Sequence, residues 1–575
     1  MIRKDARRRY AAPLLLAVVG LVASCGGDDD DDSSTVTEAP ATTAGASDTT
    51  SAATTPADTS GDSTATTAAA PDTTAAAGGE SACASTGEGG DVTVAAYSFT
   101  QSLDPTVAGA NGLLGASEMA AIYDTLMQFN TETGEFEPRV AESLEHNDDF
   151  TEWTLTLRDG VTFGNGDPLT AADVKASIER HSAEESKSTS KSLVAVISAM
   201  EPVDDLTLTF TLSESWPKFP YILTLAPGMI TNPRIVTERG ADLVSNPTGA
   251  GVGPFEFERF APNEEVVLTP RDDYWGGTVC PSNLRFIAVT GGGQAAYDAL
   301  SNGEVDVMIN RDSRVIAQAK DDGIQGIDYV VSSGWLFALN SGAKGSTPPT
   351  ADVRIRRAIA AAIDVNTIND RAEDGKGNPT TLAIAPGSIL YQDVPGPEYD
   401  LEKAKALVEE VKAEGTWDGK IRFQCSPDPL QSEQALTASA MLTAAGFEVE
   451  MTTTATIGDM VTKVVGEGDF DISCWGFNTF DSNAWGGLKG VGSAEASNYY
   501  GYNDPNMDAA LAELKLAPDV DAEKAALVKL QAAWTDTVPH IVLGAADNFV
   551  GYADGVEGLT PSADTIILYD QVRAG

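Results

Sequence analysis

One short segment of the chain combines side chains that suit the capture of a small solute. Residues 474–485 hold four aromatic side chains, two amides and one carboxylate. Aromatic faces enclose a solute and a few polar groups orient it, without any bond being made or broken. A packed corner of the core is the alternative interpretation, and for the carboxylate a turn cap is an equal alternative. The candidate binding residues of this segment are Trp475, Phe477, Asn478, Asp481 and Trp485.

Four more candidates follow predicted strands, because ligands often bind at loops beyond the ends of strands. Tyr97, Phe99 and Gln101 lie at the end of the first predicted strand, and Asn340 ends an apolar run over residues 335–340. A purely structural role is the alternative for each of them. Together with the aromatic segment, they form the predicted binding site.

The sequence motifs of common enzyme classes are missing from this chain. It holds no Gly-x-Ser-x-Gly nucleophile elbow, no HExxH helix and no phosphate-binding P-loop. Its three histidines, His146, His181 and His540, are too far apart in sequence to suggest a metal site or histidine-based catalysis. We therefore expect a binding protein with no catalytic residues, no metal and no cofactor. A tethered extracellular hydrolase and a structural envelope protein are the alternatives.

The chain of 575 residues is strongly acidic, with 85 Asp and Glu against 37 Lys and Arg and a net charge of −48. Like charges repel, so neither nucleic acid nor an anionic membrane surface is an expected partner.

The N-terminus resembles the signal of a bacterial lipoprotein. A basic start is followed by an apolar stretch over residues 14–22 and then by Val-Ala-Ser-Cys, which ends at Cys25. The resemblance implies that residues 1–24 are removed and that Cys25 is lipidated. Residues 25–90 are rich in Thr, Ala and Asp and too polar to form a core, so we expect a disordered tether. We expect an extracytoplasmic protein whose lipid anchors it to the outer face of the cell membrane. An ordinary cleaved signal is the alternative.

Four cysteines remain in the body of the chain, an even number in a compartment that permits disulfides. Four cysteines allow three connectivities. We favour a bond between Cys425 and Cys474, because both end strand-like runs in the same half of the body. This leaves Cys83 to pair with Cys280, and free buried thiols are the alternative.

The rest of the chain alternates between strand and helix patterns, which indicates an α/β body. One helix is predicted to begin after Thr170 in a capping-box pattern, and another after the cap Asp400. A third, over residues 352–364, places its apolar residues on one face. We therefore expect Arg356 and Arg357 to lie on its exposed face and to pair with carboxylates, with attraction of an anionic ligand as the alternative.

Several segments, taken in order, resemble the extracytoplasmic solute-binding proteins of ABC importers, family 5, the peptide- and nickel-binding type. Each motif is weak alone, and the resemblance depends on their order and spacing over most of residues 91–575. In chain order the motifs are Leu-Asp-Pro (103–105), Tyr-Asp-Thr-Leu (123–126), the passage 153–174, Asn-Pro-Thr-Gly (246–249), Gly-Pro-Phe (253–255), Asp-Tyr-Trp-Gly-Gly (273–277), Gly-Glu-Val-Asp (303–306) and the segment 352–359.

This resemblance implies a two-lobed, periplasmic-binding-protein-like fold of the large, type II peptide-binding class, with a hinge of two crossing strands. The large lobe would comprise residues 91–335, with 546–575 returning to it, and the second lobe residues 336–545. The implied function is that of a monomeric receptor, which encloses a small solute between its lobes and delivers it to a membrane permease and its ATPase. An oligopeptide is the default solute.

The resemblance also compares the aromatic segment with that of peptide-binding relatives, where a Trp is followed three residues later by an Asp. That Asp pairs with the ammonium group of the peptide. Here Trp475 matches the Trp, but Asn478 stands at the acidic position and the nearest carboxylate is Asp481. An amide hydrogen-bonds a polar ligand but does not neutralise a buried ammonium. The sequence therefore departs from the peptide-binding pattern at this position.

Overall fold

An eleven-stranded mixed sheet runs through the computed structural model, which describes residues 83–107 and 111–575 as parts of one compact unit. The strand order is β15-β14-β16-β12-β17-β11-β1-β10-β9-β8, and β13 pairs with β17. The strands are β1 (Asp91–Ala96), β8 (Phe255–Ala261), β9 (Glu265–Pro270), β10 (Asn283–Ala288), β11 (Val307–Asn310), β12 (Gln325–Leu339), β13 (Asn378–Pro379), β14 (Lys420–Cys425), β15 (Glu448–Thr453), β16 (Ile472–Trp475) and β17 (His540–Tyr552).

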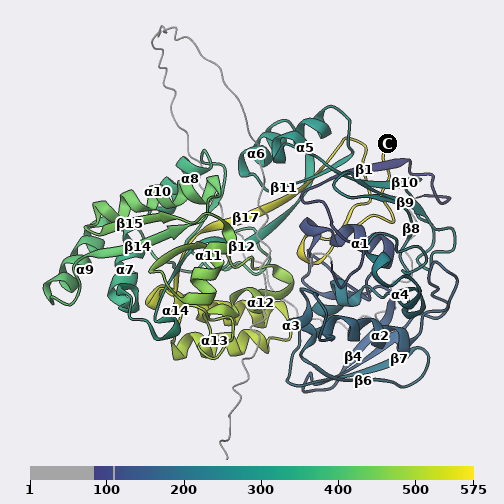
Figure 1. The fold of residues 1–575 in the computed structure, drawn as a ribbon, viewed down its shortest axis with the longest axis horizontal. Coiled ribbons are helices and arrows are strands. Elements are labelled where there is room, and N and C mark those ends of the chain that lie inside the picture. Colours follow the sequence, from purple (N-terminus) through teal and green to yellow (C-terminus); the bar gives the residue numbers. More distant parts are fainter. Residues whose placement is uncertain (1–82, 108–110) are drawn as a thin grey trace, which may run out of the picture. The chain divides into compact units, whose positions relative to one another are not determined.

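Two long strands, β12 and β17, belong to both halves of the molecule (Figure 1). They pair antiparallel along almost their full length, with an irregular register between Val331 and Trp335. Towards one end of the pair, Val550 packs into the hydrophobic core of the first lobe. Towards the other end, Leu336 and Ile541 pack into the core of the second lobe. The fold is therefore two-lobed with a hinge of two crossing strands, which confirms the fold class predicted from the sequence.

The first lobe packs short helices and small antiparallel sheets around β1 and β8 to β11. Strand β5 shows how the sequence produces such a sheet with one buried face. Its residues Trp153, Leu155 and Leu157 are buried, and the residues between them are partly exposed on the other face. The further strands are β2 (Met127–Phe129), β3 (Phe136–Pro138), β4 (Ala141–His146), β5 (Glu152–Leu157), β6 (Ile197–Pro202), β7 (Thr207–Leu212), β18 (Thr560–Pro561) and β19 (Ile567–Leu568). The helices are α1 (Ala116–Tyr123), α2 (Ala171–Ser182), α3 (Lys191–Val194), α4 (Pro233–Arg239), α5 (Gly292–Ser301) and α6 (Ser313–Asp321).

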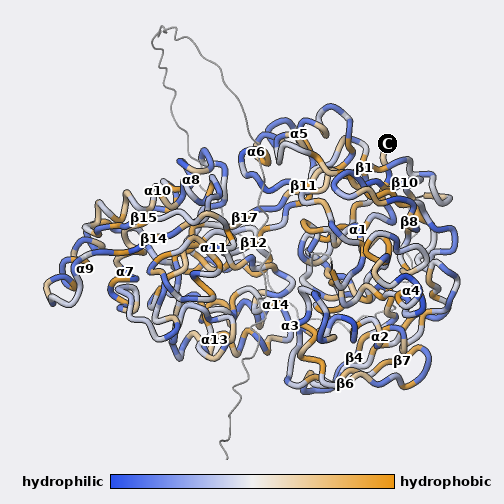
Figure 2. Tube along the Cα trace, in the orientation of Figure 1, coloured by the Kyte–Doolittle hydropathy of each residue, from blue (hydrophilic) through white to orange (hydrophobic). Residues whose placement is uncertain are grey.

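The second lobe covers β14, β15 and β16 with helices, and two hydrophobic clusters form its interior. Figure 2 shows hydrophobic stretches inside the lobe and hydrophilic stretches along outer helices such as α9. Its helices are α7 (Val353–Ala362), α8 (Val365–Ala372), α9 (Leu401–Ala413), α10 (Pro429–Ala444), α11 (Ile457–Val461), α12 (Ala484–Leu488), α13 (Pro505–Lys515) and α14 (Val520–Thr537).

Local capping signals place two predicted helices correctly. Helix α2 begins after Thr170, and the side chains of Thr170 and Asp173 form the capping box. Helix α9 begins after Asp400, whose carboxylate accepts a hydrogen bond from the Lys403 backbone N–H at 2.9 Å. Both caps satisfy N–H groups that the first turn of a helix leaves without partners.

The exposed position predicted for Arg356 is wrong. Its side chain is buried and donates hydrogen bonds to the carbonyls of Thr537 and Val538, at 3.0 Å each. These carbonyls end α14 and lack partners within that helix, so a cation stabilises them. Arg357 does pair with a carboxylate, that of Asp536.

Two disulfides join Cys83 to Cys280 and Cys425 to Cys474, the pairing favoured from the sequence. The signal over residues 1–24 and Cys25 lie outside the described residues, as does most of the tether predicted for 25–90. From residue 83 onward, excepting 108–110, no helix is both long and apolar enough to cross a membrane.

Candidate solute-binding site

Polar side chains from three elements converge where the two lobes meet. Arg311 directly follows β11 of the first lobe, and its Nη2 donates a hydrogen bond of 3.1 Å to Oδ1 of Asn478, which follows β16 of the second lobe. The Arg311 guanidinium also lies over the ring of Trp335 in β12, 5.6 Å from the ring centre. A cation and an amide thus face each other across the hinge on an aromatic surface.

The backbone around Asn478 fixes the position of this amide. Phe477 donates its N–H to the carbonyl of Ser333 at 2.9 Å, and Thr479 and Ser332 exchange two backbone hydrogen bonds of 2.9 Å. Between these contacts, Asn478 has a φ of 48°, in the left-handed region that Asn tolerates better than most residues. The loop after β16 is therefore attached to the crossing strand β12 on both sides of Asn478.

Asp547 in β17 carries a carboxylate whose charge acts on Arg311. Its Oδ1 is buried and has no hydrogen-bond partner among the residues that the structure describes. Burial raises the pKa of Asp547, while a hydrogen bond from Asn378 and the charge of Arg311 act in the opposite direction. Burial likewise lowers the pKa of Arg311, against the influence of Tyr97 and Asp547. Arg311 and Asp547 therefore influence the pKa of each other without forming an ion pair, and the charges of Asp328 and Lys320 act on Asp547 as well.

The predicted residues beyond β1 take different positions in the first lobe. Tyr97 is close enough to Arg311 to affect its pKa. Phe99 stacks on Phe260 with 6.1 Å between ring centres. Gln101 is exposed and donates to Oδ1 of Asn263 at 3.1 Å. The structure thus brings Tyr97 to the Arg311 group and holds the other two side chains by contacts within their own lobe.

The aromatic residues of the predicted segment face the interior of the second lobe or its boundary. Trp475 is 6% exposed and contacts Tyr500 edge-on. Phe477 packs against both hydrophobic clusters of that lobe. Trp485 meets Trp216 of the first lobe, with 6.4 Å between ring centres.

Asp481 and Asn340 direct their polar atoms to groups of the second lobe. Asp481 accepts hydrogen bonds from Ser388 Oγ and from the Ile389 N–H at 3.1 Å, and burial raises its pKa. Asn340 is fully buried, and its amide donates to two carbonyls and accepts from two backbone N–H groups. Both side chains therefore hold loops in place in this structure, and their contact with a solute stays a prediction.

Further polar contacts join the lobes away from Arg311. Asp564, buried in the first lobe, accepts hydrogen bonds from Tyr221 at 2.8 Å and from Ser482 of the second lobe at 2.7 Å. Burial raises the pKa of Asp564 to about 6. Lys218 of the first lobe pairs with Glu523 of α14. The two lobes are thus in direct contact along the boundary between them.

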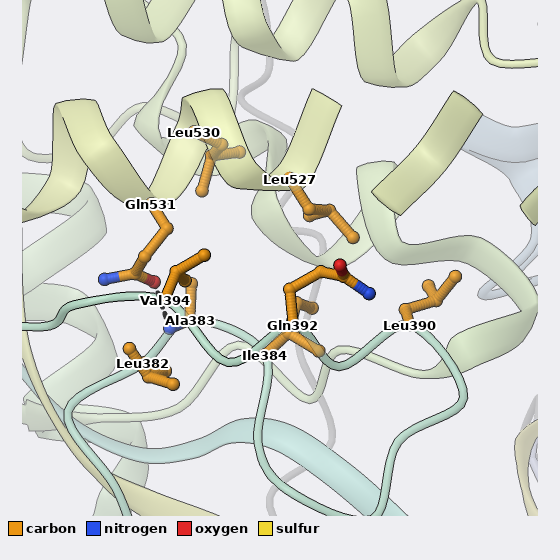
Figure 3. A pocket seen from close by; sticks show the side chains of 9 residues that line it. All are labelled: Leu382, Ala383, Ile384, Leu390, Gln392, Val394, Leu527, Leu530 and Gln531. Atoms are coloured by element: carbon orange, nitrogen blue, oxygen red, sulfur yellow. Dashed lines mark hydrogen bonds between the residues drawn. The ribbon is translucent and has the colours of Figure 1, made fainter. Parts of the chain in front are cut away.

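Two small cavities lie in the second lobe, and neither is large enough for a solute. One is lined by residues of the 382–394 loop and by Leu527, Leu530 and Gln531 of α14 (Figure 3). The other lies beside Trp335 and Glu373. Each has room for about one water molecule. Within residues 83–107 and 111–575, no group of three or more His, Cys, Asp and Glu side chains is placed to hold a metal ion.

Sequence reasoning did not single out Arg311 and Asp547. Arg311 immediately follows a strand, so the rule that selected Tyr97 and Asn340 applies to it equally. Asp547 lies inside β17 and carries no such signal. It reaches the site only because β17 lies between β12 and β11 in the sheet.

Comparison with known proteins relates the fold to one family. Residues 135–499 match the family model described as bacterial extracellular solute-binding proteins, family 5 Middle. A probable D,D-dipeptide-binding periplasmic protein of Escherichia coli K12 is 27% identical over 387 residues, covering 65% of this chain and 72% of its own. Among solved structures, HbpA2 of Haemophilus parasuis has a TM-score of 0.71 at 22% identity, with 84% of this chain and 100% of that one covered. A dipeptide-binding protein of Pseudoalteromonas sp. SM9913 in complex with Met-Leu has a TM-score of 0.67 at 19% identity, with the same coverage.

Proposed function

Since the chain belongs to the bacterial extracellular solute-binding proteins of family 5, we propose that it is the receptor of an ABC importer and that its solute is a short peptide. The observation that carries this proposal is the convergence of Arg311, Trp335 and Asn478 from both lobes at the hinge. A peptide is supported by the D,D-dipeptide-binding name of one relative and by the Met-Leu complex of another.

Capture in this proposal is an equilibrium between separated and joined lobes. A solute that contacts both lobes shifts the equilibrium towards the joined arrangement, because it binds that arrangement more tightly. The contacts of Asp564 with Ser482 and of Lys218 with Glu523 then hold the lobes together. The joined form signals to the permease that the receptor is loaded.

The proposed solute contacts fall into two groups. Tyr97 and Asn478 contact the solute directly, because both lie beside Arg311 at the hinge. Trp475 and Phe477 support the loop that carries Asn478. Asp481 and Asn340 position neighbouring turns, since their hydrogen bonds are already satisfied.

We also propose that a lipid on Cys25 holds the receptor at the outer face of the cell membrane and that the segment up to residue 90 acts as its tether. The receptor acts as a monomer, and its partners are the membrane permease and the ATPase. Cys25→Ser is expected to release the protein from the membrane fraction or to block its processing. Membrane attachment of that variant at the wild-type level would contradict the lipid anchor.

The experiment that tests the peptide proposal uses the full-length protein and a library of di- and tripeptides. Bound peptides are recovered after size exclusion and identified by mass spectrometry, and their affinity is measured by calorimetry. We expect them to be recovered intact. Cleaved products would favour the hydrolase alternative, and the absence of any bound peptide would contradict a peptide solute.

Asn478→Gly provides a matched variant for this experiment. Glycine adopts positive φ freely, so the substitution removes the amide without straining the loop. We expect an affinity loss of about tenfold, because the solute loses one hydrogen bond, and a small fall in melting temperature, because Arg311 loses its one side-chain acceptor. Unchanged affinity would remove Asn478 from the site.

A further inference from the structure

The Arg311 guanidinium is poorly satisfied in a protein with a large excess of carboxylates. A guanidinium has five N–H donors and suits a carboxylate with two of them in parallel. Arg311 makes one side-chain hydrogen bond, to the neutral amide of Asn478, and forms no ion pair with any residue that the structure describes. Its Nε is buried and has no acceptor.

Arg356 shows how this fold satisfies a buried guanidinium when the role is structural. Its Nε and Nη1 donate to four backbone carbonyls, each at 3.0 Å. Both arginines are sufficiently enclosed for burial to lower their pKa. The difference between them is that Arg356 has four acceptors within the chain, whereas Arg311 has one.

The charge of Asp547 raises the pKa of Arg311, but Asp547 does not neutralise Arg311 through an ion pair. Its buried Oδ1 also lacks a partner, and the two side chains form no ion pair although each affects the pKa of the other. The Nε donor of Arg311 and the Oδ1 acceptor of Asp547 are therefore both buried and unpaired. Leaving a buried donor without a partner costs free energy, which a ligand that supplies an acceptor to Arg311 recovers.

We infer that Arg311 binds a carboxylate of the solute, so that the acidic end of the solute lies at the hinge on the face of Trp335. This inference rests on the proposed function and assigns the orientation and charge of its solute. The amide of Asn478 is neutral, so its hydrogen bond leaves the positive charge of the guanidinium available to the solute. The site therefore takes solutes with a free carboxylate and rejects those in which it is blocked.

The test compares three versions of one tripeptide library: free, N-acetylated and C-amidated. Full-length protein is incubated with each, and retained peptides are counted by mass spectrometry. We expect free and N-acetylated peptides to be retained and amidated ones to bind about a hundredfold more weakly, since a charged partner is lost. Equal retention of amidated peptides would overturn the inference. If no peptide from any of the three libraries is retained, the result contradicts the proposed peptide solute and leaves the role of Arg311 to the second measurement.

A second measurement tests Arg311 without any ligand. Arg311→Met removes an unpaired buried charge, so the melting temperature of the unliganded protein is expected to stay the same or rise. Arg356→Met is the matched control and is expected to lower it, because four carbonyls lose their donor. A fall for Arg311→Met as large as for Arg356→Met would overturn the inference. Arg311→Lys keeps the charge and is expected to retain the preference for free carboxylates at lower affinity.

Discussion

Lys218 and Glu523 form an ion pair between the lobes, with 2.8 Å between Nζ and Oε2 and side chains that are only 8% and 2% exposed. Lys515 and Glu214 form a second pair between the lobes, at 2.7 Å and with more exposure to water. The buried pair has the larger effect, because removal of one partner leaves a charge that has lost its water.

Lys218→Met is expected to separate the lobes in the unliganded protein. Glu523 would remain buried without its cation, which costs about 3–5 kcal/mol, and separation exposes it to water again. Small-angle X-ray scattering should therefore show a larger radius of gyration than for the wild type.

Two further variants control this experiment. Lys218→Met combined with Glu523→Met leaves no unpaired charge, so the scattering curve should return towards that of the wild type. Lys529→Met breaks a pair with Glu513 whose side chains are 60% and 50% exposed, and it should change nothing measurable. A wild-type radius for Lys218→Met alone would contradict a role of this pair in lobe contact.

Contact between the lobes is expected to strengthen as the pH falls. Asp564 has a pKa of about 6 where the lobes meet, raised by burial, and it would titrate near its ordinary value of 3.8 in water. A raised pKa contributes stability that is fully present below the ordinary value and is lost as pH rises through about 6. Scattering at about pH 5 should therefore show more of the joined form than at about pH 7.5.

Asp564→Asn is the variant that isolates this effect. The amide keeps hydrogen-bonding capacity towards Tyr221 and Ser482 but does not titrate. Burial also raises the pKa of Glu523, so the variant should reduce the pH dependence and not abolish it. A pH dependence identical to that of the wild type would exclude Asp564 as its source.

Trp475→Ala is expected to destabilise the second lobe. Its side chain is buried against Tyr500, and truncation of a large aromatic residue leaves a cavity that costs about 3–5 kcal/mol. Tyr399→Ala, at a position 51% exposed, is the control and should cost little. Urea unfolding followed by circular dichroism measures both, and equal midpoints would contradict the packing described for Trp475.

Loss of the disulfide between Cys425 and Cys474 should also lower stability. It closes a loop of 49 residues, for which chain entropy predicts a stabilisation of about 4 kcal/mol. Cys425→Ala combined with Cys474→Ala should therefore melt earlier than the wild type under oxidising conditions. Under reducing conditions the two proteins should melt more nearly alike, and a persistent large gap would indicate a packing defect.

The first residues of two helices were predictable from the sequence, because each helix begins after a residue that caps it. The caps Thr170 and Asp400 each accept a hydrogen bond from the N–H group three residues later, so the pattern itself contains both partners. Arg356 was not predictable in the same way. Its acceptors, Thr537 and Val538, lie far along the chain and become neighbours only when α7 packs against α14.

The candidate site was predictable only in part for the same reason. Tyr97 was found by the rule that ligands bind at loops beyond the ends of strands, and Asn478 was found as a polar member of the aromatic segment. The relationship of Arg311 to Asp547 depends on the sheet order β12-β17-β11, which no short pattern encodes. Aromatic content selected Trp475 and Phe477, but aromatic side chains fill cores as readily as they line clefts.

The irregular stretch of β12 has a mechanical consequence. Ser333 has a φ of 51°, and Ser332 bonds to Thr479 instead of continuing the ladder with β17. A swing of one lobe against the other must bend or twist β12 and β17 where they cross between the lobes, and we expect this change to concentrate where their ladder is interrupted. The irregular stretch then acts as a hinge that bends at low cost, while the hydrogen bonds between β12 and β17 on either side of it stay intact. We therefore expect the side-chain contacts between the lobes, such as that of Lys218 with Glu523, to contribute more to the cost of opening than the backbone does.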